Sequence, residues 1–353
     1  MKLRYTRLGA IVTALVLVTA ACGDDDDAGG DADGAGDEVE RVSLTVATPF
    51  PSATGFYDLY AADGRGYFDE ENLDVSIEPL DGSGATLQAV VTGSADVAVS
   101  SPGPLMQAVG EDGDFVSMFT GYQDGIFSLV TLADSGVQSV EDLRGTTVGV
   151  GALDAGETPV VKSILSEAGL EEGADYELLA VGDGGTASAA LSGGDVSAYG
   201  AAFIDVLILE ASGFETRDLT PEEFELGTDE HYVVTGEKFE NDRDVIERFG
   251  RALAKGHAFA VANPDEALNI ACEALPEECE DRAFAEDFLA AVMDFKELPE
   301  SADGQWGFTD LDAMEVFAAQ LVDQGELADE PDVGAVFRND YVEAYNDFDE
   351  ADL

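Results

Sequence analysis

Segments with the two-residue period of β-strands alternate with short helix-like segments through the first two thirds of the sequence. SLTVATP (43–49) and LDVSIEPL (73–80) place apolar residues at every second position, as a strand with one buried face does. A strand at 147–151 leads through a glycine-rich loop into a helix, with Thr158 expected as its N-cap and Pro159 at its first position. Strands that alternate with helices in this way predict an α/β fold with mostly parallel sheets.

The last third of the sequence differs, because helix-like segments follow one another without strands between them. Residues 241–264 predict a long amphipathic helix that ends at a proline, and further helices are expected around 265–275, 283–294 and 309–324. From residue 41 onward the chain has about 310 residues, which is enough for two domains.

The N-terminus has the pattern of an export signal. Basic residues in the first seven positions precede an uncharged apolar run, Leu8–Ala21, whose 14 residues are fewer than the about 20 that span a membrane. Thr19-Ala20-Ala21-Cys22 resembles a bacterial lipobox, although Thr19 replaces the usual Leu. Residues 1–22 are therefore predicted to be a lipoprotein signal peptide and lipobox. The lipid on Cys22 would anchor the protein to the outer face of the cell membrane. The alternative is an ordinary signal peptide cut near Ala21.

Acidic residues dominate the rest of the chain. Residues 23–40 are almost entirely Gly, Asp, Ala and Glu, a composition that predicts a disordered tether. The whole chain has 75 acidic and 16 basic residues and a formal net charge of −59. Such a charge argues against nucleic acid and anionic lipid as partners and is typical of a salt-adapted surface. Membrane contact is thus expected through the lipid anchor only.

The cysteines and histidines indicate no metal site. Besides Cys22, only Cys272 and Cys279 are present, and a turn at Pro276 between them allows their sulfur atoms to meet. In an oxidising compartment a disulfide is the favoured interpretation, and two separately buried thiols are the alternative. Neither a CxxC pair nor a histidine cluster occurs in the sequence, so we expect neither a metal nor another cofactor.

Several motifs, in their order and spacing, resemble one known family. They resemble the periplasmic substrate-binding proteins of ABC importers for sulfonates, taurine, nitrate and thiamine-pyrimidine precursors, over roughly residues 43–340. Asn72 departs from this pattern, because the family usually has Gly there. The matching segments are Gly66–Phe68, Leu73, Gly82–Gly84, Gly93, Asp96–Ser101, 142–158, 262–268 and 306–327.

The resemblance implies the type II-like periplasmic-binding-protein fold, with two α/β lobes and a hinge between them. Residues 41–124 and 231–353 would form lobe 1, and residues 125–230 would form lobe 2. The small solute would be enclosed between the lobes. The resemblance also implies a monomer that acts with an ABC permease and its ATPase.

The candidate ligand-binding residues follow the strands, because open α/β sheets bind ligands beyond the carboxyl ends of their strands. Helix N-termini there offer unpaired N–H groups, hydroxyls add donors and acceptors, and aromatic rings stack on planar solutes. Each candidate also has a purely structural alternative, such as capping a helix or packing under a loop. The candidates are Ser52, Thr54, Phe56, Tyr57, Ser83, Thr86, Ser100, Ser101, Asp154, Thr158, Phe203 and Asp205.

These loops hold no Lys or Arg and instead contain Asp154, Glu157 and Asp205. Their charge favours a neutral or cationic, aromatic solute such as a pyrimidine precursor over a sulfonate or nitrate. The predicted function is an extracytoplasmic solute-binding lipoprotein without enzymatic activity. One alternative is an enzyme of the same fold related to thiamine-pyrimidine synthesis, although the cysteine-rich motif of such enzymes and a GxSxG elbow are both missing. The other is a surface lipoprotein that binds no small ligand.

Overall fold

A computed structural model describes residues 40–221, 224, 228–323 and 325–353 of the chain. The predicted signal peptide, the lipidated Cys22 and the tether up to residue 39 lie outside the described residues. Residues 40–353 form one compact unit. Within the described part, no helix has the length and apolarity needed to cross a membrane.

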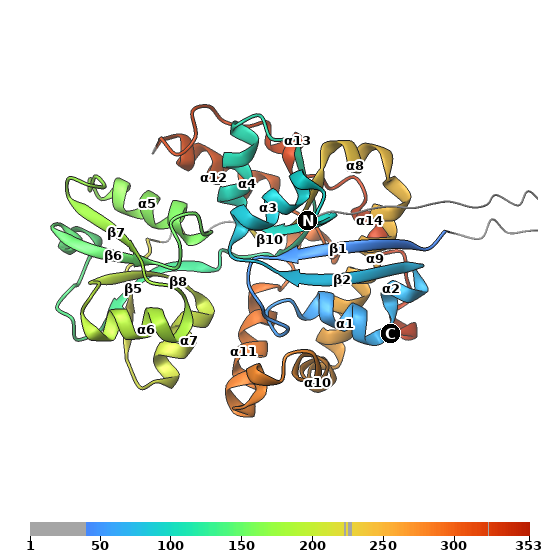
Figure 1. Ribbon diagram of the computed structural model, residues 1–353, viewed down its shortest axis with the longest axis horizontal. Coiled ribbons are helices and arrows are strands. Elements are labelled where there is room, and N and C mark those ends of the chain that lie inside the picture. The colour runs from blue at the N-terminus through green and yellow to red at the C-terminus, as the bar shows by residue number, and fades with distance from the viewer. Residues whose placement is uncertain (1–39, 222–223, 225–227, 324) are drawn as a thin grey trace, which may run out of the picture. The chain divides into compact units, whose positions relative to one another are not determined.

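The first sheet contains five strands in the order β2-β1-β3-β10-β4 (Figure 1). Strands β1 (Val42–Thr48), β2 (Leu73–Pro79) and β3 (Val97–Ser100) are parallel to one another. Strand β10 (Asp229–Thr235) lies antiparallel between β3 and β4 (Phe115–Tyr122). Strand β10 comes from far along the chain, after the strands of the second sheet.

Strands β5 to β9, which come between β4 and β10 in the sequence, form the second sheet, in the order β7-β6-β8-β5-β9. Strands β6 (Thr146–Val150), β7 (Tyr176–Ala180) and β8 (Ala198–Ala202) are parallel. Strand β5 (Phe127–Leu132) is antiparallel to both β8 and β9 (Thr216–Asp218). The two mixed sheets, each with a parallel core, give the predicted α/β class.

The chain passes from the first sheet to the second after β4 and is back in the first sheet at β10. We call residues 40–122 and 229–353 the first lobe and residues 127–218 the second lobe. The predicted division, with boundaries after residues 124 and 230, stays a prediction; strand β10 begins at Asp229, two residues before the predicted return at residue 231.

Helices pack on both faces of each sheet (Figure 1). In the second lobe, α5 (Glu157–Glu167) lies on one face, and α6 (Gly184–Gly193) and α7 (Phe203–Ala211) lie on the other. The helices of the first lobe are α1 (Tyr57–Arg65), α2 (Tyr67–Glu70), α3 (Ser83–Thr92), α4 (Pro102–Gly110), α8 (Gly236–Asn241), α9 (Arg243–Ala262), α10 (Pro264–Ala274), α11 (Arg282–Phe295), α12 (Leu311–Asp323), α13 (Val333–Val336) and α14 (Val342–Tyr345).

Helix α9 is the long predicted helix, and it anchors the first lobe by packing on α1. Its stripe of Ile246, Phe249 and Leu253 is buried in the larger hydrophobic core. A Cβ atom on Gly256 would collide with the backbone of α1, so the close approach of the two helices requires glycine there. The ring of His257 stacks on Trp306 at 3.9 Å between centroids and is buried, so this side chain packs inside the lobe.

Two local features bear on the sequence predictions. Asn72 has φ = +54°, a left-handed conformation that asparagine tolerates better than most residues, which accounts for its place where the family has Gly. Cys272 and Cys279, the pair favoured for a disulfide, are bonded to each other and tie the end of α10 to a 3₁₀ turn (Pro276–Cys279).

Candidate functional site

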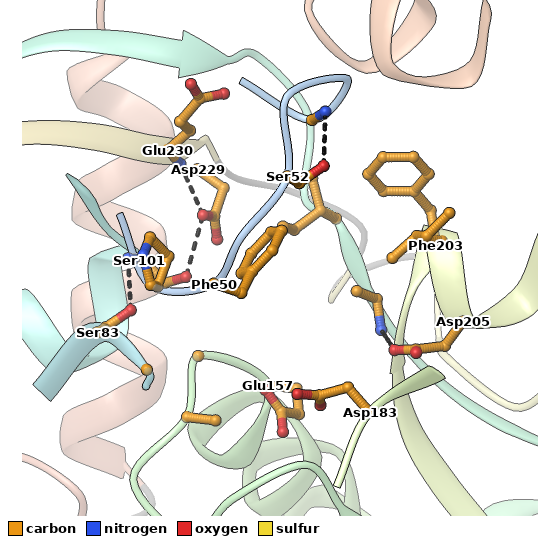
Figure 2. Close-up of a pocket in the computed structure, with 18 of the residues that line it drawn as sticks. Phe50, Ser52, Ser83, Ser101, Glu157, Asp183, Phe203, Asp205, Asp229 and Glu230 are labelled. Carbon is orange, nitrogen blue, oxygen red and sulfur yellow. Dashed lines mark hydrogen bonds between the residues drawn. The ribbon is translucent and has the colours of Figure 1, made fainter. Parts of the chain in front are cut away.

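A cavity of about 540 Å³ lies between the two lobes, where the loops after their strands face each other (Figure 2). This volume is typical of sites for small organic ligands. Its lining residues are Pro49, Phe50, Pro51, Ser52, Gly55, Phe56, Leu80, Asp81, Gly82, Ser83, Val99, Ser100, Ser101, Tyr122, Ile126, Phe127, Ala152, Ala155, Gly156, Glu157, Asp183, Gly184, Ala202, Phe203, Ile204, Asp205, Ile208, Asp229, Glu230, Glu278, Phe284 and Phe288.

The structure brings seven of the twelve predicted ligand-binding residues to this cavity. Ser83, Ser101 and Asp229 form a hydrogen-bonded chain along one wall (Figure 2). In it the Ser101 N–H donates to Ser83 Oγ at 3.1 Å, and Ser101 Oγ donates to Asp229 Oδ1 at 3.0 Å. The seven are Ser52, Phe56, Ser83, Ser100, Ser101, Phe203 and Asp205.

Three of the other predicted residues belong to the buried framework of the first lobe. The Tyr57 hydroxyl lies 3.1 Å from His257 Nε2, inside the core. Thr86 donates its hydroxyl hydrogen to backbone carbonyls, including that of Val99 at 2.8 Å, so it ties α3 to β3. Thr54 is also buried and contributes only its backbone N–H to a hydrogen bond near the cavity.

The remaining two predicted residues lie in the second lobe and also miss the cavity lining. Thr158 does not cap α5, because the helix already begins at Glu157. Its hydroxyl donates instead to the carbonyl of Ala152 at 2.8 Å. Asp154 is exposed to solvent on the loop before α5.

Phenylalanine rings form the apolar side of the cavity. Phe50 and Phe56 lie 5.1 Å apart between centroids on the loop after β1. Phe203, at the start of α7, reaches across to α11, where its ring lies 5.9 Å from that of Phe288 and 4.6 Å from that of Phe295. The rings of both lobes therefore provide flat surfaces for a planar solute.

Carboxyl groups form the polar side of the cavity, and burial raises the pKa of Glu157, Asp205 and Asp229. The pKa of Glu157 rises to about 7, that of Asp229 to about 7 and that of Asp205 to about 6. Asp183 shares the wall of the second lobe, and burial raises its pKa as well. Among the described residues that line the cavity, none is Lys or Arg, so these carboxyl groups face the cavity without a cation.

A buried lysine lies behind the wall that carries Glu230. Lys296 Nζ is 3.0 Å from Asp58 Oδ1 and 2.5 Å from Glu230 Oε2, and the three side chains are at most 1% exposed. The rings of Tyr57 and Tyr122 each lie 4.8 Å from Nζ. Burial alone would lower the pKa of Lys296, but the two carboxylates raise it above its usual value. Burial also raises the pKa of Glu230.

The same region holds the first connection between the lobes and the start of β10. The carbonyl of Phe295 accepts a hydrogen bond from the Gln123 N–H at 2.8 Å, which fixes the connection at residues 123–126 to the end of α11. Glu230, the second residue of β10, has φ = +54°, a strained value for a residue with a side chain. Its ion pair with Lys296 fixes the start of β10 to the same helix end.

Residue patterns along the chain left several lining residues unidentified. Asp229 and Glu230 directly precede the predicted strand at His231, so their position at a strand end was the available signal. Glu278, Phe284 and Phe288 come from the C-terminal helical region, more than 200 residues after the loop that they face. Only the tertiary fold brings them there, and no local pattern indicates it.

The model of the NMT1/THI5-like family matches residues 53–267, more than half of the chain. The chain belongs to this family. A formylaminopyrimidine-binding protein of Halalkalibacterium halodurans is 28% identical over 66% of this chain and 71% of its own length. The riboflavin-binding protein RibY of Chloroflexus aurantiacus is 23% identical over 97% of this chain and 98% of its own length.

Solved structures share the fold of this NMT1/THI5-like chain. The alkanesulfonate-binding protein SsuA from Xanthomonas axonopodis pv. citri, bound to MOPS, matches with a TM-score of 0.65 and 13% identity over 85% of this chain and 99% of that protein. The desulfurization enzyme DSZB also matches, with a TM-score of 0.58 and 15% identity over 86% of this chain and 99% of that protein. The fold thus serves binding proteins and an enzyme, and the matches together support a solute-binding role for this chain.

Proposed function

We propose that this chain is an extracytoplasmic binding protein for a planar, nitrogen-containing heterocycle that is neutral or cationic, with aminopyrimidines as the first candidates. The observation that carries the proposal is the cavity itself, enclosed by phenylalanine rings and carboxyl groups from both lobes. A heteroaromatic ring stacks on phenylalanine, and its amino groups donate hydrogen bonds to carboxylates.

The proposed route of the solute is an ABC importer. We propose that Cys22 carries the lipid anchor, that residues 23–40 act as a tether, and that a monomer delivers the solute to a permease and its ATPase. Contact of the solute with both lobes would favour the closed arrangement, because a ligand shifts a conformational balance by its differential affinity for the two states. The similarity to the formylaminopyrimidine-binding protein supports this solute class.

A binding screen tests the proposed solute class. The protein without residues 1–22 would be tested by calorimetry and thermal shift against aminopyrimidines, riboflavin, butanesulfonate and nitrate, at constant high ionic strength. We expect an aminopyrimidine to bind with a Kd of about 1 μM or lower. Preference for butanesulfonate or nitrate, or the absence of binding by any planar heterocycle, would contradict the proposal.

Phe203→Ala should weaken binding of the solute found in that screen by about 10- to 50-fold, because it removes one stacking surface and the contact with α11. Calorimetry on the folded variant measures the loss. Phe214→Ala is the matched control, since Phe214 is a half-buried phenylalanine of the same lobe that does not line the cavity. Equal affinities of the two variants would remove Phe203 from the site.

An enzymatic function is the second candidate, because DSZB shares the fold. Catalysis needs a nucleophile or a general base in contact with the solute. The carboxyl groups of Glu157 and Asp229, with pKa values of about 7, are the groups suited to proton transfer. Recovery of the bound solute unchanged, by mass spectrometry after prolonged incubation, would support binding, and a changed product would support an enzyme.

A further inference from the structure

Several backbone N–H groups of the loops after the strands, at the cavity or next to its lining residues, are bonded to the chain's own carboxylates. In the first lobe, Glu278 Oε2 accepts from the N–H groups of Ala53 and Thr54, at 3.2 and 2.9 Å. The disulfide at the neighbouring Cys279 fixes the turn that carries Glu278. The chain therefore places a negative charge where the loop after β1 could have bound an anion.

The second lobe repeats this arrangement at its helix N-termini. Asp205 accepts from the N–H of Gly184, the first residue of α6, at 2.7 Å, and from that of Ala202, directly before α7, at 3.1 Å. Glu157 accepts from the N–H of Gly151 at 2.7 Å. Gly151 directly follows β6, whereas Gly184 and Ala202 lie at helix starts. N–H groups at helix starts bind anionic ligands in many proteins, and here those of Gly184 and Ala202 are occupied.

Two further helix starts beside the cavity, those of α4 and α3, are poor anion sites for other reasons. Helix α4 begins with Pro102 and has Pro104 two residues later, and neither residue carries an N–H. The start of α3 follows Asp81, which lines the cavity. From the second lobe, Asp154 Oδ2 comes within 3.4 Å of the place that a Cβ atom on Gly84 would take. An anion at α3 would therefore meet two carboxylates.

We propose that Glu157, Asp205 and Glu278 determine specificity by acting as built-in anions, which occupy the backbone donors of the cavity and thereby exclude sulfonates and other anionic solutes. This inference rests on the proposed function in placing the solute in this cavity, and it deepens that function by naming the residues that reject one solute class. The fold relative that holds MOPS shows that the same fold can accept a sulfonate.

Methanesulfonate is the probe for this inference, because it is small enough to replace a missing carboxylate. Asp205→Ala frees the N–H groups of Gly184 and Ala202, so we expect methanesulfonate to bind this variant at least about tenfold more tightly than the wild type and to raise its Tm. Asp205→Asn keeps one acceptor oxygen for one of these two donors, because the N–H groups of Gly184 and Ala202 bond to different oxygens of Asp205, and it should show less of this gain.

Asp142→Ala is the matched control, because exposed Asp142 also accepts two backbone N–H groups, those of Gln138 and Ser139, but lies outside the cavity. It should gain no affinity. If Asp205→Ala does not fold, Glu278→Ala replaces it, since Glu278 is half-buried on a short turn.

Equal methanesulfonate binding by the wild type and the cavity variants would overturn the inference. The assay uses no heterocycle, so its result is independent of whether an aminopyrimidine binds. Failure of the proposed solute and failure of the built-in anions are therefore distinguishable.

Discussion

Lys296→Met should lower the free energy of unfolding by about 3–5 kcal/mol, because it removes the cation that pairs with two buried carboxyl groups. Methionine keeps the length of the side chain and fills most of its volume, so packing changes little. Asp58 would then hold a charge inside the core without a partner cation, and its Oδ2 already has no hydrogen-bond partner among the described residues. Urea unfolding at pH 7 and constant salt measures the change.

Lys255→Met is the control, because Lys255, 17% exposed, forms a 3.0 Å ion pair with Glu70, which is 57% exposed, and a longer one of 3.9 Å with Glu71. Such exposed pairs contribute about 0–1 kcal/mol. A double-mutant cycle of Lys296→Met with Asp58→Asn adds a second measure, since the double variant should recover part of the loss. If Lys296→Met and Lys255→Met had equal free energies of unfolding, the buried ion pairs would contribute no more stability than a surface pair.

The network matters for function because it holds the start of β10 beside the first connection between the lobes, residues 123–126. Glu230 pairs with Lys296 and directly follows Asp229, which lines the cavity. A perturbation of Lys296 should therefore change solute affinity as well as stability. The sequence offered no sign of this network, since Asp58, Glu230 and Lys296 are 66 to 238 residues apart and none is part of a recognisable motif.

The regular elements of the fold were largely predictable from hydrophobic periodicity. The strands expected at 43–49, 73–80 and 147–151 correspond to β1, β2 and β6 within one residue at each end. Strand β4 was not predicted, because all eight of its residues are buried and FVSMFTGY shows no alternation.

The rule that ligands bind beyond the carboxyl ends of the strands located the cavity, but the prediction drawn from it was wrong about the chemistry in one respect. It correctly placed loop residues such as Ser52, Ser101 and Phe203 around one space. It also predicted free N–H groups at the helix starts, whereas Asp205 fills those of Gly184 and Ala202. Periodicity identifies a helix start, but it cannot show which distant side chain occupies the donors there, because that contact depends on the tertiary fold.

Asp229 should make the protein without solute less stable as the pH rises, which is the opposite of the usual effect of an ion-paired carboxylate. Burial raises the pKa of Asp229 to about 7 in the folded state, whereas an unfolded chain has an ordinary value near 4. The folded state thus binds the proton more tightly. The stability from this group is fully present below about pH 4 and is lost as the pH rises through about 7.

Asp229→Asn should remove this dependence, because asparagine does not titrate and can still accept the hydrogen bonds from Ser101 Oγ and the Glu230 N–H. Between pH 5 and pH 8 the wild type should lose about 2–3 kcal/mol more unfolding free energy than this variant, as measured by urea unfolding at constant salt. Asp154→Asn, which changes an exposed carboxyl near the cavity, should keep the wild-type dependence. Equal pH dependences of the wild type and Asp229→Asn would mean that Asp229 is ionised in the folded protein throughout this range, and the cavity would then carry a permanent charge for a cationic solute.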